Sequence, residues 1–348
     1  MGRRETDRKL LTLEAKIRKI YAEAEVDLRQ KLDDHMQAFA RKDAIKRDQL
    51  KRGVITSEDY NKWRIGQIMT GKRWEAMLQN ISADLANTER IAKSVANGYM
   101  PEVYALNMNY ATYAIENQLH IDTSFVLYNR EAIERIILEE PDLLPAPGGL
   151  MLNKFATGEA IRWQKGQIQS VVMQSILQGE SIPNMATRIA ASLCTGGRKA
   201  AIRYARTAVT GAENAGRLDS FRRMESMGIK MKKTWVAVLD SRTRDAHREL
   251  DGQTVPVSKP FHNSIGKIMS PGDPTAHGAN IWNCRCMMIS QLEGFERDMS
   301  DLSLRNTSKL GDMSYDEWKK AHGKSQNILM PDKVAALMRG RYAREYRR

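Results

Sequence analysis

The chain has 348 residues, 42% hydrophobic and 28% charged, so it can hold one large domain or two of ordinary size around a real core. This composition excludes wholesale disorder, and the sequence contains no apolar run of the roughly 18 residues that a membrane-spanning helix needs. The net charge of +13 favours a polyanionic partner, most simply nucleic acid, although surplus surface lysine would give the same charge.

Three cysteines, Cys194, Cys284 and Cys286, are too few for a disulfide framework. The first residues contain no apolar signal core. We therefore expect a protein made in a reducing cytoplasm and used there or in a particle assembled there. Aromatic residues make up only 7% of the chain, which argues against binding of single strands by stacking.

Residues 1–140 are predicted to form an arm of long helices. Apolar side chains recur three and four residues apart from residue 7 to about 50, and again from about 57 to 97. Gly53 lies between these stretches, and Thr56 and Asp59 resemble a capping box that starts the second one. The pattern predicts an antiparallel helical hairpin.

Gly98 and Pro101 are expected to end that hairpin, before shorter helices at 104–118 and 129–139. Residues 141–157 are predicted to be a linker, because three prolines and two glycines crowd its first nine positions.

Residues 158–230 are predicted to be helical again. One helix is expected to run from about Gly158 to Gly179, Ser181 is expected to cap the next, and a further helix is expected from about Arg198 to Met227.

Residues 231–295 are predicted to form a small α+β module, and 296–348 a polar, basic tail. Alternating side chains predict a first strand at 230–239, and Asp240 or Ser241 is expected to cap a short helix. Asp251-Gly252 is a turn signal, and further short strands are expected at 254–257, 266–269 and 285–292. The fold class is therefore mainly α with a C-terminal α+β module.

Cys, His, Asp and Arg are concentrated in this module. His247, Cys284 and Cys286 have the side chains of a zinc site, with His277 or Asp251 as the candidate fourth ligand and His262 or water as further choices. Such a zinc ion would be structural, because the module has little core of its own. The alternative is that the cysteines are small buried hydrophobic residues and that His247 bonds a backbone carbonyl.

An enzyme is the second alternative, namely a metal-dependent nuclease or hydrolase that uses His247 and the two cysteines. The sequence contains no paired carboxylates, no phosphate-binding Gly-rich loop and no nucleophile elbow. We expect instead that Asp240 caps a helix and that Arg242 and Arg244 tie loops together through carboxylates such as Asp273. The prediction is that the protein is not an enzyme.

The C-terminal tail is strongly basic. Its arginines can lie along DNA phosphates and gain affinity by counterion release, or they can belong to a solvated chain end. A stand-alone DNA-binding protein is a third alternative. The candidate DNA-binding residues are Arg339, Arg341, Arg344, Arg347 and Arg348.

Short motifs follow one another in order between about residues 158 and 322. They are YARTAVT from Tyr204, NAGR from Asn214, KTW from Lys233, DSRTR from Asp240, His247, LDG from Leu250, PGDP from Pro271, NCRC from Asn283 and YDEW from Tyr315. In this order they resemble the phage head-morphogenesis family named for the Mu protein F. Ala208 departs from the family, which often has Glu there. The expected structural motif residues are Trp235, Asp240, Arg242, Arg244, Asp251, Gly252, Asn283 and Arg285.

The resemblance implies a minor head protein inside the head of a tailed phage, associated with the portal, that acts in head assembly and in DNA packaging or ejection. The implied partners are the portal protein, a major capsid or scaffolding protein and packaged double-stranded DNA, with no membrane. The implied location is the virion interior, in several copies per head, after synthesis in the host cytoplasm.

Overall fold

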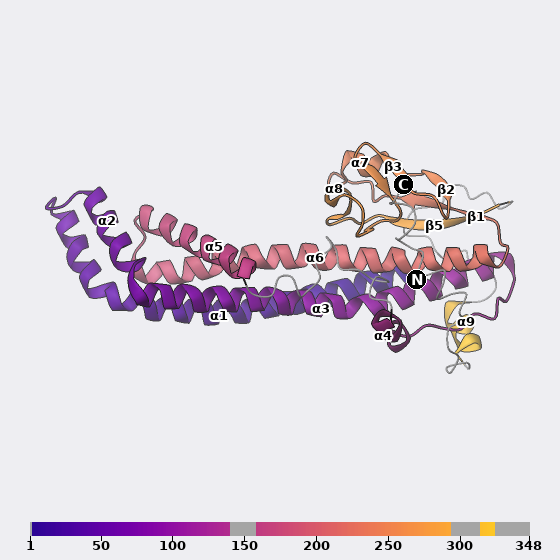
Figure 1. The fold of residues 1–348 in the computed structure, drawn as a ribbon, viewed down its shortest axis with the longest axis horizontal. Helices are drawn as coiled ribbons and strands as arrows, with labels where there is room; N and C mark the ends of the chain where they lie inside the picture. Colours follow the sequence, from indigo (N-terminus) through magenta and orange to yellow (C-terminus); the bar gives the residue numbers. More distant parts are fainter. Residues whose placement is uncertain (1, 140–157, 294–313, 324–348) are drawn as a thin grey trace. The chain divides into compact units, whose positions relative to one another are not determined.

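The computed structural model describes residues 2–139, 158–293 and 314–323, and it is mainly helical with short strands near the C-terminus, as predicted (Figure 1). It contains two compact units. The first comprises Met1–Leu13, Ala96–Met151 and Arg203–Arg348, and the second Glu14–Val95 and Leu152–Ile202. The predicted domain boundaries stay a prediction. No described helix is long and apolar enough to cross a membrane.

Three long helices contribute to both units. They are α1 (Gly2–Lys51), α3 (Gly71–Leu119) and α6 (Ile182–Ser226). In α1 the predicted apolar face is buried, with Ile17 and Leu32 both fully inaccessible to solvent. The predicted stop after α1 is confirmed, because Gly53 has a φ of +73°, which glycine adopts without strain.

The second unit also contains α2 (Ser57–Ile68) and α5 (Gly158–Leu177). The predicted capping box of Thr56 and Asp59 starts α2. The buried Arg64 on α2 lies 3.2 Å from an oxygen of Asp43 and donates to the carbonyl of Glu180 at 2.7 Å. A buried guanidinium needs such partners, so this contact ties α1 and α2 to the start of α6.

The helix predicted at 57–97 begins where expected, at Ser57, but its predicted continuity and its predicted end are wrong. The break comes earlier, between α2 and α3, where Gly71 has a φ of +82°. Gly98 and Pro101 do not end a helix, since α3 continues to Leu119. Pro101 removes one backbone hydrogen bond, but Met100 and Val103 beside it are buried, and burial of this apolar face outweighs the local preference.

The expected helix start near Arg198 is also wrong, because α6 is continuous from Ile182 to Ser226. Gly197 packs against Tyr21 of α1. A Cβ atom at Gly197 would lie 2.7 Å from the Tyr21 ring. This glycine therefore permits close helix packing and does not end the helix.

The module in the first unit contains a three-stranded antiparallel sheet in the order β2-β1-β5. Its strands are β1 (Met231–Val236), β2 (Thr254–Pro256) and β5 (Met287–Leu292), with Trp235 opposite Met288. A separate hairpin consists of β3 (Phe261–Asn263), which was not predicted, and β4 (Gly266–Ile268). Two four-residue helices complete the module, α7 (Asp245–Arg248) and α8 (Gly278–Ile281).

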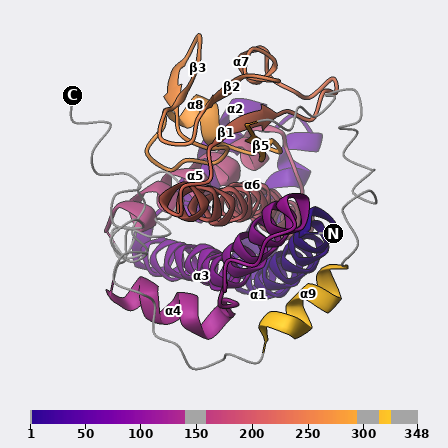
Figure 2. The same cartoon turned by 90° about the vertical axis from the view of Figure 1, so that its right-hand side faces the viewer.

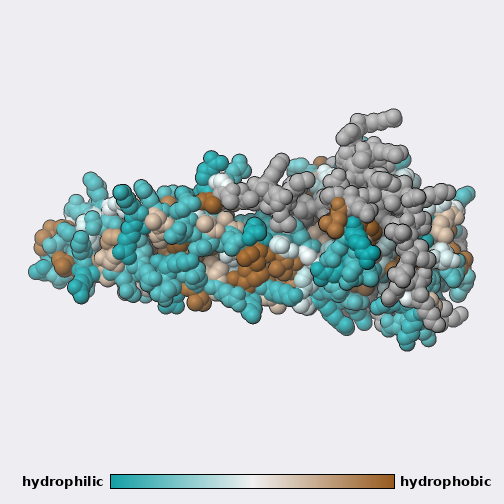
Figure 3. Space-filling model, turned by 60° about the horizontal axis from the view of Figure 1, so that its bottom comes forward, coloured by the Kyte–Doolittle hydropathy of each residue, from teal (hydrophilic) through white to brown (hydrophobic). Residues whose placement is uncertain are grey.

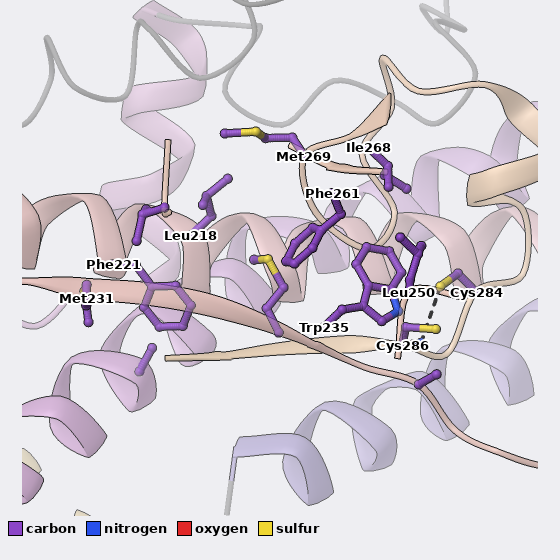
Figure 4. Packing of buried hydrophobic residues seen from close by; sticks show 14 of the residues in the cluster. Leu218, Phe221, Met231, Trp235, Leu250, Phe261, Ile268, Met269, Cys284 and Cys286 are labelled. Carbon is purple, nitrogen blue, oxygen red and sulfur yellow. Dashed lines mark hydrogen bonds between the residues drawn. The ribbon is translucent and has the colours of Figure 1, made fainter. Parts of the chain in front are cut away.

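The module packs on α6, whose other side packs on α3 (Figure 2). One hydrophobic cluster joins all three, with Ile115 from α3, Phe221 from α6 and Trp235 from β1 (Figure 4). Trp235 is completely buried, and its ring lies edge-on to Phe261 at 5.3 Å between ring centroids. The core of the module is thus shared with the long helices, as its small size requires.

Two further helices belong to the first unit, α4 (Arg130–Glu139) and α9 (Tyr315–His322). The sequence predicted α4 but not α9, which Ser314 and Glu317 start with a capping box. The space-filling view shows one face on which hydrophilic side chains predominate and hydrophobic ones form smaller patches, as expected for amphipathic helices (Figure 3).

Glycines set the closest approaches in the first unit. A Cβ atom at Gly216 on α6 would lie 2.4 Å from the carbonyl oxygen of Tyr104 on α3. On another face of α6, a Cβ atom at Gly211 would lie 2.9 Å from the carbonyl oxygen of Gly272 in the module. Both contacts are with backbone atoms, which cannot rotate away.

We expect Gly216→Ala to lower the free energy of unfolding of the first unit by about 1–3 kcal/mol, because α3 and α6 must separate to admit the methyl group. Gly98→Ala is the matched control on α3, where a Cβ atom would meet nothing within 4 Å. It should raise the stability by about 0.5–1 kcal/mol. Urea denaturation of both variants measures the difference, and equal effects would contradict the close contact.

Candidate metal centre

One face of α6 holds the segment that carries the two cysteines. Thr207, Thr210, Asn214 and Arg217 are spaced by three, four and three residues, so they lie on one side of the helix. They span about 15 Å along the helix axis at 1.5 Å per residue. The segment 283–288 spans roughly 16 Å when extended, so side chains and backbone can match along their length.

The match is made by hydrogen bonds from side chains to backbone. The Asn283 N–H donates to the Thr207 hydroxyl at 2.8 Å, and the Thr210 hydroxyl donates to the carbonyl of Cys284 at 2.9 Å. Asn214 donates to the carbonyl of Cys286 at 3.3 Å and accepts from the Met288 N–H at 2.9 Å. Arg217 donates to the carbonyl of Met288 at 3.4 Å. We call these four side chains the α6 polar stripe.

His247 from α7 faces both cysteines. Its Nδ1 lies 3.3 Å from Cys286 Sγ and 3.6 Å from Cys284 Sγ. All three residues are buried, and their candidate ligand atoms lie within 4.8 Å of one another. The structure thus brings together the three residues named as metal ligands, as well as Trp235, whose ring lies edge-on to His247.

The hydrogen bonds of His247 define its tautomer. Nε2 lies 2.9 Å from the carbonyl oxygen of Asn280 and 3.1 Å from a guanidinium nitrogen of Arg244. A carbonyl only accepts and a guanidinium only donates, so Nε2 cannot serve both. Arg244 already donates to the carbonyl of Trp282 at 2.8 Å, so we assign the Nε2 proton to the bond with Asn280. Nδ1 is then the atom directed at the sulfurs.

The two thiols differ in acidity. The pKa of Cys286 is lowered to about 5, chiefly by the hydrogen bond from the Cys284 thiol and against the effect of burial. The same hydrogen bond and burial raise the pKa of Cys284 well above its usual value. Cys286 is therefore the more acidic of the two thiols. The Cys286 N–H also donates to Cys284 Sγ, at 3.3 Å (Figure 4).

The structure does not bring the candidate fourth ligands to this cluster. Asp251 accepts from the Ala237 N–H at 2.7 Å and so fixes the turn at Gly252, whose φ is +73°. The exposed His277 accepts from the Ala279 N–H and caps α8. His262 is exposed on β3.

The sequence predicted that Asp240 caps a helix. This prediction is wrong, because the N-cap of α7 is Arg244. Asp240 instead forms two hydrogen bonds of 2.6 Å with Arg285, and these bonds hold the pKa of its carboxyl well below the usual value. Arg285 thus points away from the cluster while the cysteines on either side of it point in.

The predicted role of the two module arginines is also corrected. Arg242 lies 3.5 Å from Asp240 and is largely exposed. Arg244 bonds a carbonyl and not a carboxylate. Asp273 accepts from the Met269 and Thr275 N–H groups. Arg244 and Asp273 therefore each bond backbone groups.

Sequence reasoning missed the role of the α6 polar stripe, although its residues stand in the motifs named above. It also missed a second group, Glu116, Asp122 and His322, whose members are far apart in the sequence. The tail residues Arg339, Arg341, Arg344, Arg347 and Arg348 lie outside the described residues.

The chain is similar to known proteins. Residues 166–289 match the family described as Phage Mu protein F like protein. The chain is 25% identical to the Minor head protein GP7 of Bacillus phage SPP1 over 272 residues, 78% of this chain and 83% of that protein. No solved structure matches it significantly.

Two bacterial proteins match smaller shares of their own length. One is the NAD(+)--arginine ADP-ribosyltransferase EFV of Enterococcus faecalis, 25% identical over 277 residues, 77% of this chain and 53% of that protein. The other is an uncharacterized protein of Haemophilus influenzae, 31% identical over 206 residues, 59% of this chain and 40% of that protein. This chain thus spans about half of the transferase and less of the second protein.

We expect Asn214→Ala to lower the free energy of unfolding of the first unit by about 2–4 kcal/mol, since it leaves the Cys286 carbonyl and the Met288 N–H buried without partners. Hydrogen exchange at the Met288 amide should become faster. Asn87→Ala, at a position on α3 outside the stripe, is the control and should change neither quantity. Unchanged exchange in Asn214→Ala would contradict the role of the α6 polar stripe.

Proposed function

We propose that this chain is a portal-associated minor head protein inside the head of a tailed phage, because residues 166–289 match the Phage Mu protein F like family and most of the chain is similar to a phage minor head protein. The observation that carries the proposal is the match to the SPP1 minor head protein, which covers most of both chains. That match is longer than the family segment, so it includes helical parts outside 166–289.

We assign the partners by the chemistry of each part. The long helices suit the portal protein and a major capsid or scaffolding protein, because α1 also carries exposed apolar side chains, Leu11, Val26 and Ile45, that can pack on a partner. The net charge of +13 suits packaged double-stranded DNA. The function follows from these contacts: head assembly, with a part in DNA packaging or ejection. The presence of several copies of the chain in each head stays a prediction.

We propose further that the protein is not an enzyme. The transferase activity in the name of the Enterococcus faecalis protein belongs to that protein, and its unmatched half leaves room for a catalytic domain that this chain does not share. A metal-dependent nuclease would need an open metal position that substrate can reach. His247, Cys284 and Cys286 are each only 3% exposed, which suits a structural centre.

The structural centre is best filled by zinc. Ligand atoms about 2.0–2.3 Å from a tetrahedral zinc ion lie roughly 3.5 Å from one another for a nitrogen and a sulfur. The Nδ1–Sγ distances in the cluster, 3.3 and 3.6 Å, bracket that value. The Nε2–H bond to the Asn280 carbonyl orients a ligand histidine in the usual way, and it also fits the alternative in which His247 only bonds a carbonyl. Of the fourth ligands named from the sequence, we assign water, since Asp251, His277 and His262 lie elsewhere, and burial of the three protein ligands keeps that water from any substrate.

Cys286→Ser should lower the zinc content of purified, reduced protein by about one equivalent per chain, because it removes one of three protein ligands. Cys194→Ser is the matched control, since Cys194 is a buried cysteine of α6 outside the cluster. Plasma emission spectrometry measures the metal. Equal zinc content in both variants would favour the alternative with no metal.

The head assignment is tested on purified particles of the phage that encodes this chain. Mass spectrometry should find the chain in heads and in complexes isolated through the portal protein, and not in separated tails. Absence from both heads and portal complexes would contradict the proposal. Tight DNA binding together with that absence would favour a stand-alone DNA-binding protein.

A variant with glutamine at all five tail arginines tests the contribution of the tail to DNA binding. We expect this variant to enter heads as the unmodified chain does. The isolated variant should bind double-stranded DNA more weakly than the unmodified chain. Its salt dependence should be shallower by about 0.9 in logarithmic slope for each phosphate that the tail no longer neutralises. Replacement of five exposed basic residues of α1, Arg8, Lys16, Lys19, Lys42 and Lys51, is the control for net charge.

A further inference from the structure

The second cluster joins the last described helix to the end of α3. On α9, Trp318 is 3% exposed and packs edge-on against Tyr113 of α3, with 5.6 Å between ring centroids. Phe125, in the loop that follows α3, stacks on the same indole at 5.8 Å. This aromatic contact accounts for the YDEW motif, and it places a histidine one helical turn later against two carboxylates.

Glu116 on α3 is the buried carboxylate of this cluster, with its side chain only 2% exposed. One oxygen accepts from the N–H and the hydroxyl of Thr123, and the other accepts from the Trp318 indole N–H at 2.6 Å. Within the described part of the chain, no lysine or arginine forms an ion pair with it. A positive charge nearby would stabilise this buried carboxylate further.

His322 supplies the remaining side of the cluster. Its Nδ1 lies 2.9 Å from the carbonyl oxygen of Trp318, so Nδ1 carries a proton. Its Nε2 is buried without a hydrogen-bond partner, and it lies 3.6 Å from Glu116 Oε2 and 3.5 Å from Asp122 Oδ1. In the neutral ring, the lone pair of Nε2 faces two carboxylate oxygens. That arrangement is repulsive unless a cation lies between them.

The distances fit a metal ion between these atoms better than a direct hydrogen bond. A charge-assisted N–H···O bond is about 2.7–2.9 Å long, shorter than either separation. Nitrogen and oxygen ligands about 2.1 Å from a tetrahedral ion lie roughly 3.4 Å apart, close to both. Asp122 Oδ1 also accepts from the Ser124 N–H at 2.7 Å, which orients it and leaves a second lone pair.

We infer that Glu116, Asp122 and His322 form a second metal site, which binds a divalent transition-metal ion such as zinc and clamps α9 to the end of α3. The surroundings are those of a ligand set: Thr123 and Trp318 orient Glu116, and the Trp318 carbonyl orients the His322 ring. Nitrogen and carboxylate ligands suit zinc, manganese and iron(II) better than calcium. The Asp122 side chain is 75% exposed, so water can complete the coordination.

Metal content tests the site. His322→Gln should lower the zinc content of purified full-length protein by about one equivalent, and Asp122→Asn, at an exposed side chain that unfolding does not complicate, should do the same. His120→Asn is the matched control, since His120 is exposed, lies outside the cluster and has a φ of +53° that asparagine tolerates. Zinc content unchanged in His322→Gln and Asp122→Asn would overturn the inference and leave a proton as the cation.

Cobalt(II) separates this site from the cysteine centre. In Cys286→Ser protein, cobalt should still give visible d–d bands, without the near-ultraviolet charge transfer of a cobalt–thiolate bond, and these bands should vanish on adding Asp122→Asn. Hydrogen exchange of the α9 amides should slow when zinc is added to metal-free protein, and not in Asp122→Asn. If only the cysteine centre does not bind metal, only the cobalt–thiolate charge-transfer band is absent. The experiment therefore tests the two proposed metal sites independently.

Discussion

The packing of the module depends on how one helix face satisfies the backbone of an extended segment. The α6 polar stripe supplies hydroxyl, amide and guanidinium groups at helical spacing, and the segment 283–288 presents its N–H and carbonyl groups at strand spacing. Buried backbone groups must be paired, so the stripe fixes both the position and the register of this segment. That register decides which way the cysteines point, and the ion pair of Arg285 with Asp240 holds the residue between them outward.

Much of the fold follows from apolar periodicity and caps. The sequence correctly predicted α1, the capping box of α2, α4 and the strand pattern of β1, because each depends on local preference or on a repeating buried face. It failed at Gly98 and Pro101, which lie within α3, and at the helix start expected near Arg198, which lies within α6, because packing stabilises both helices through residues that break isolated helices. A glycine in a sequence does not reveal whether its missing side chain makes room for a turn or for a neighbouring tyrosine.

The sequence predicted which side chains could bind a metal ion, but it did not predict the hydrogen-bond partners of the residues around them. His247, Cys284 and Cys286 could be grouped because zinc selects few side-chain types and the module is short. Asp251 and Arg244 form hydrogen bonds with backbone groups. Such groups occur in almost every residue and therefore leave no pattern in the sequence. His322 meets Glu116 only because α9 packs on α3, a contact between residues about 200 positions apart that periodicity cannot foresee.

The same contacts close the edges of the β2-β1-β5 sheet. At β5, both backbone groups of Met288 are taken by side chains of α6, and Ser290 beyond it is buried. At the other edge, β2 is three residues long and includes Pro256, which has no N–H to offer. A strand from another copy of the chain therefore meets an interrupted row of donors and acceptors at both edges, which disfavours edge-to-edge aggregation through this sheet in the folded protein.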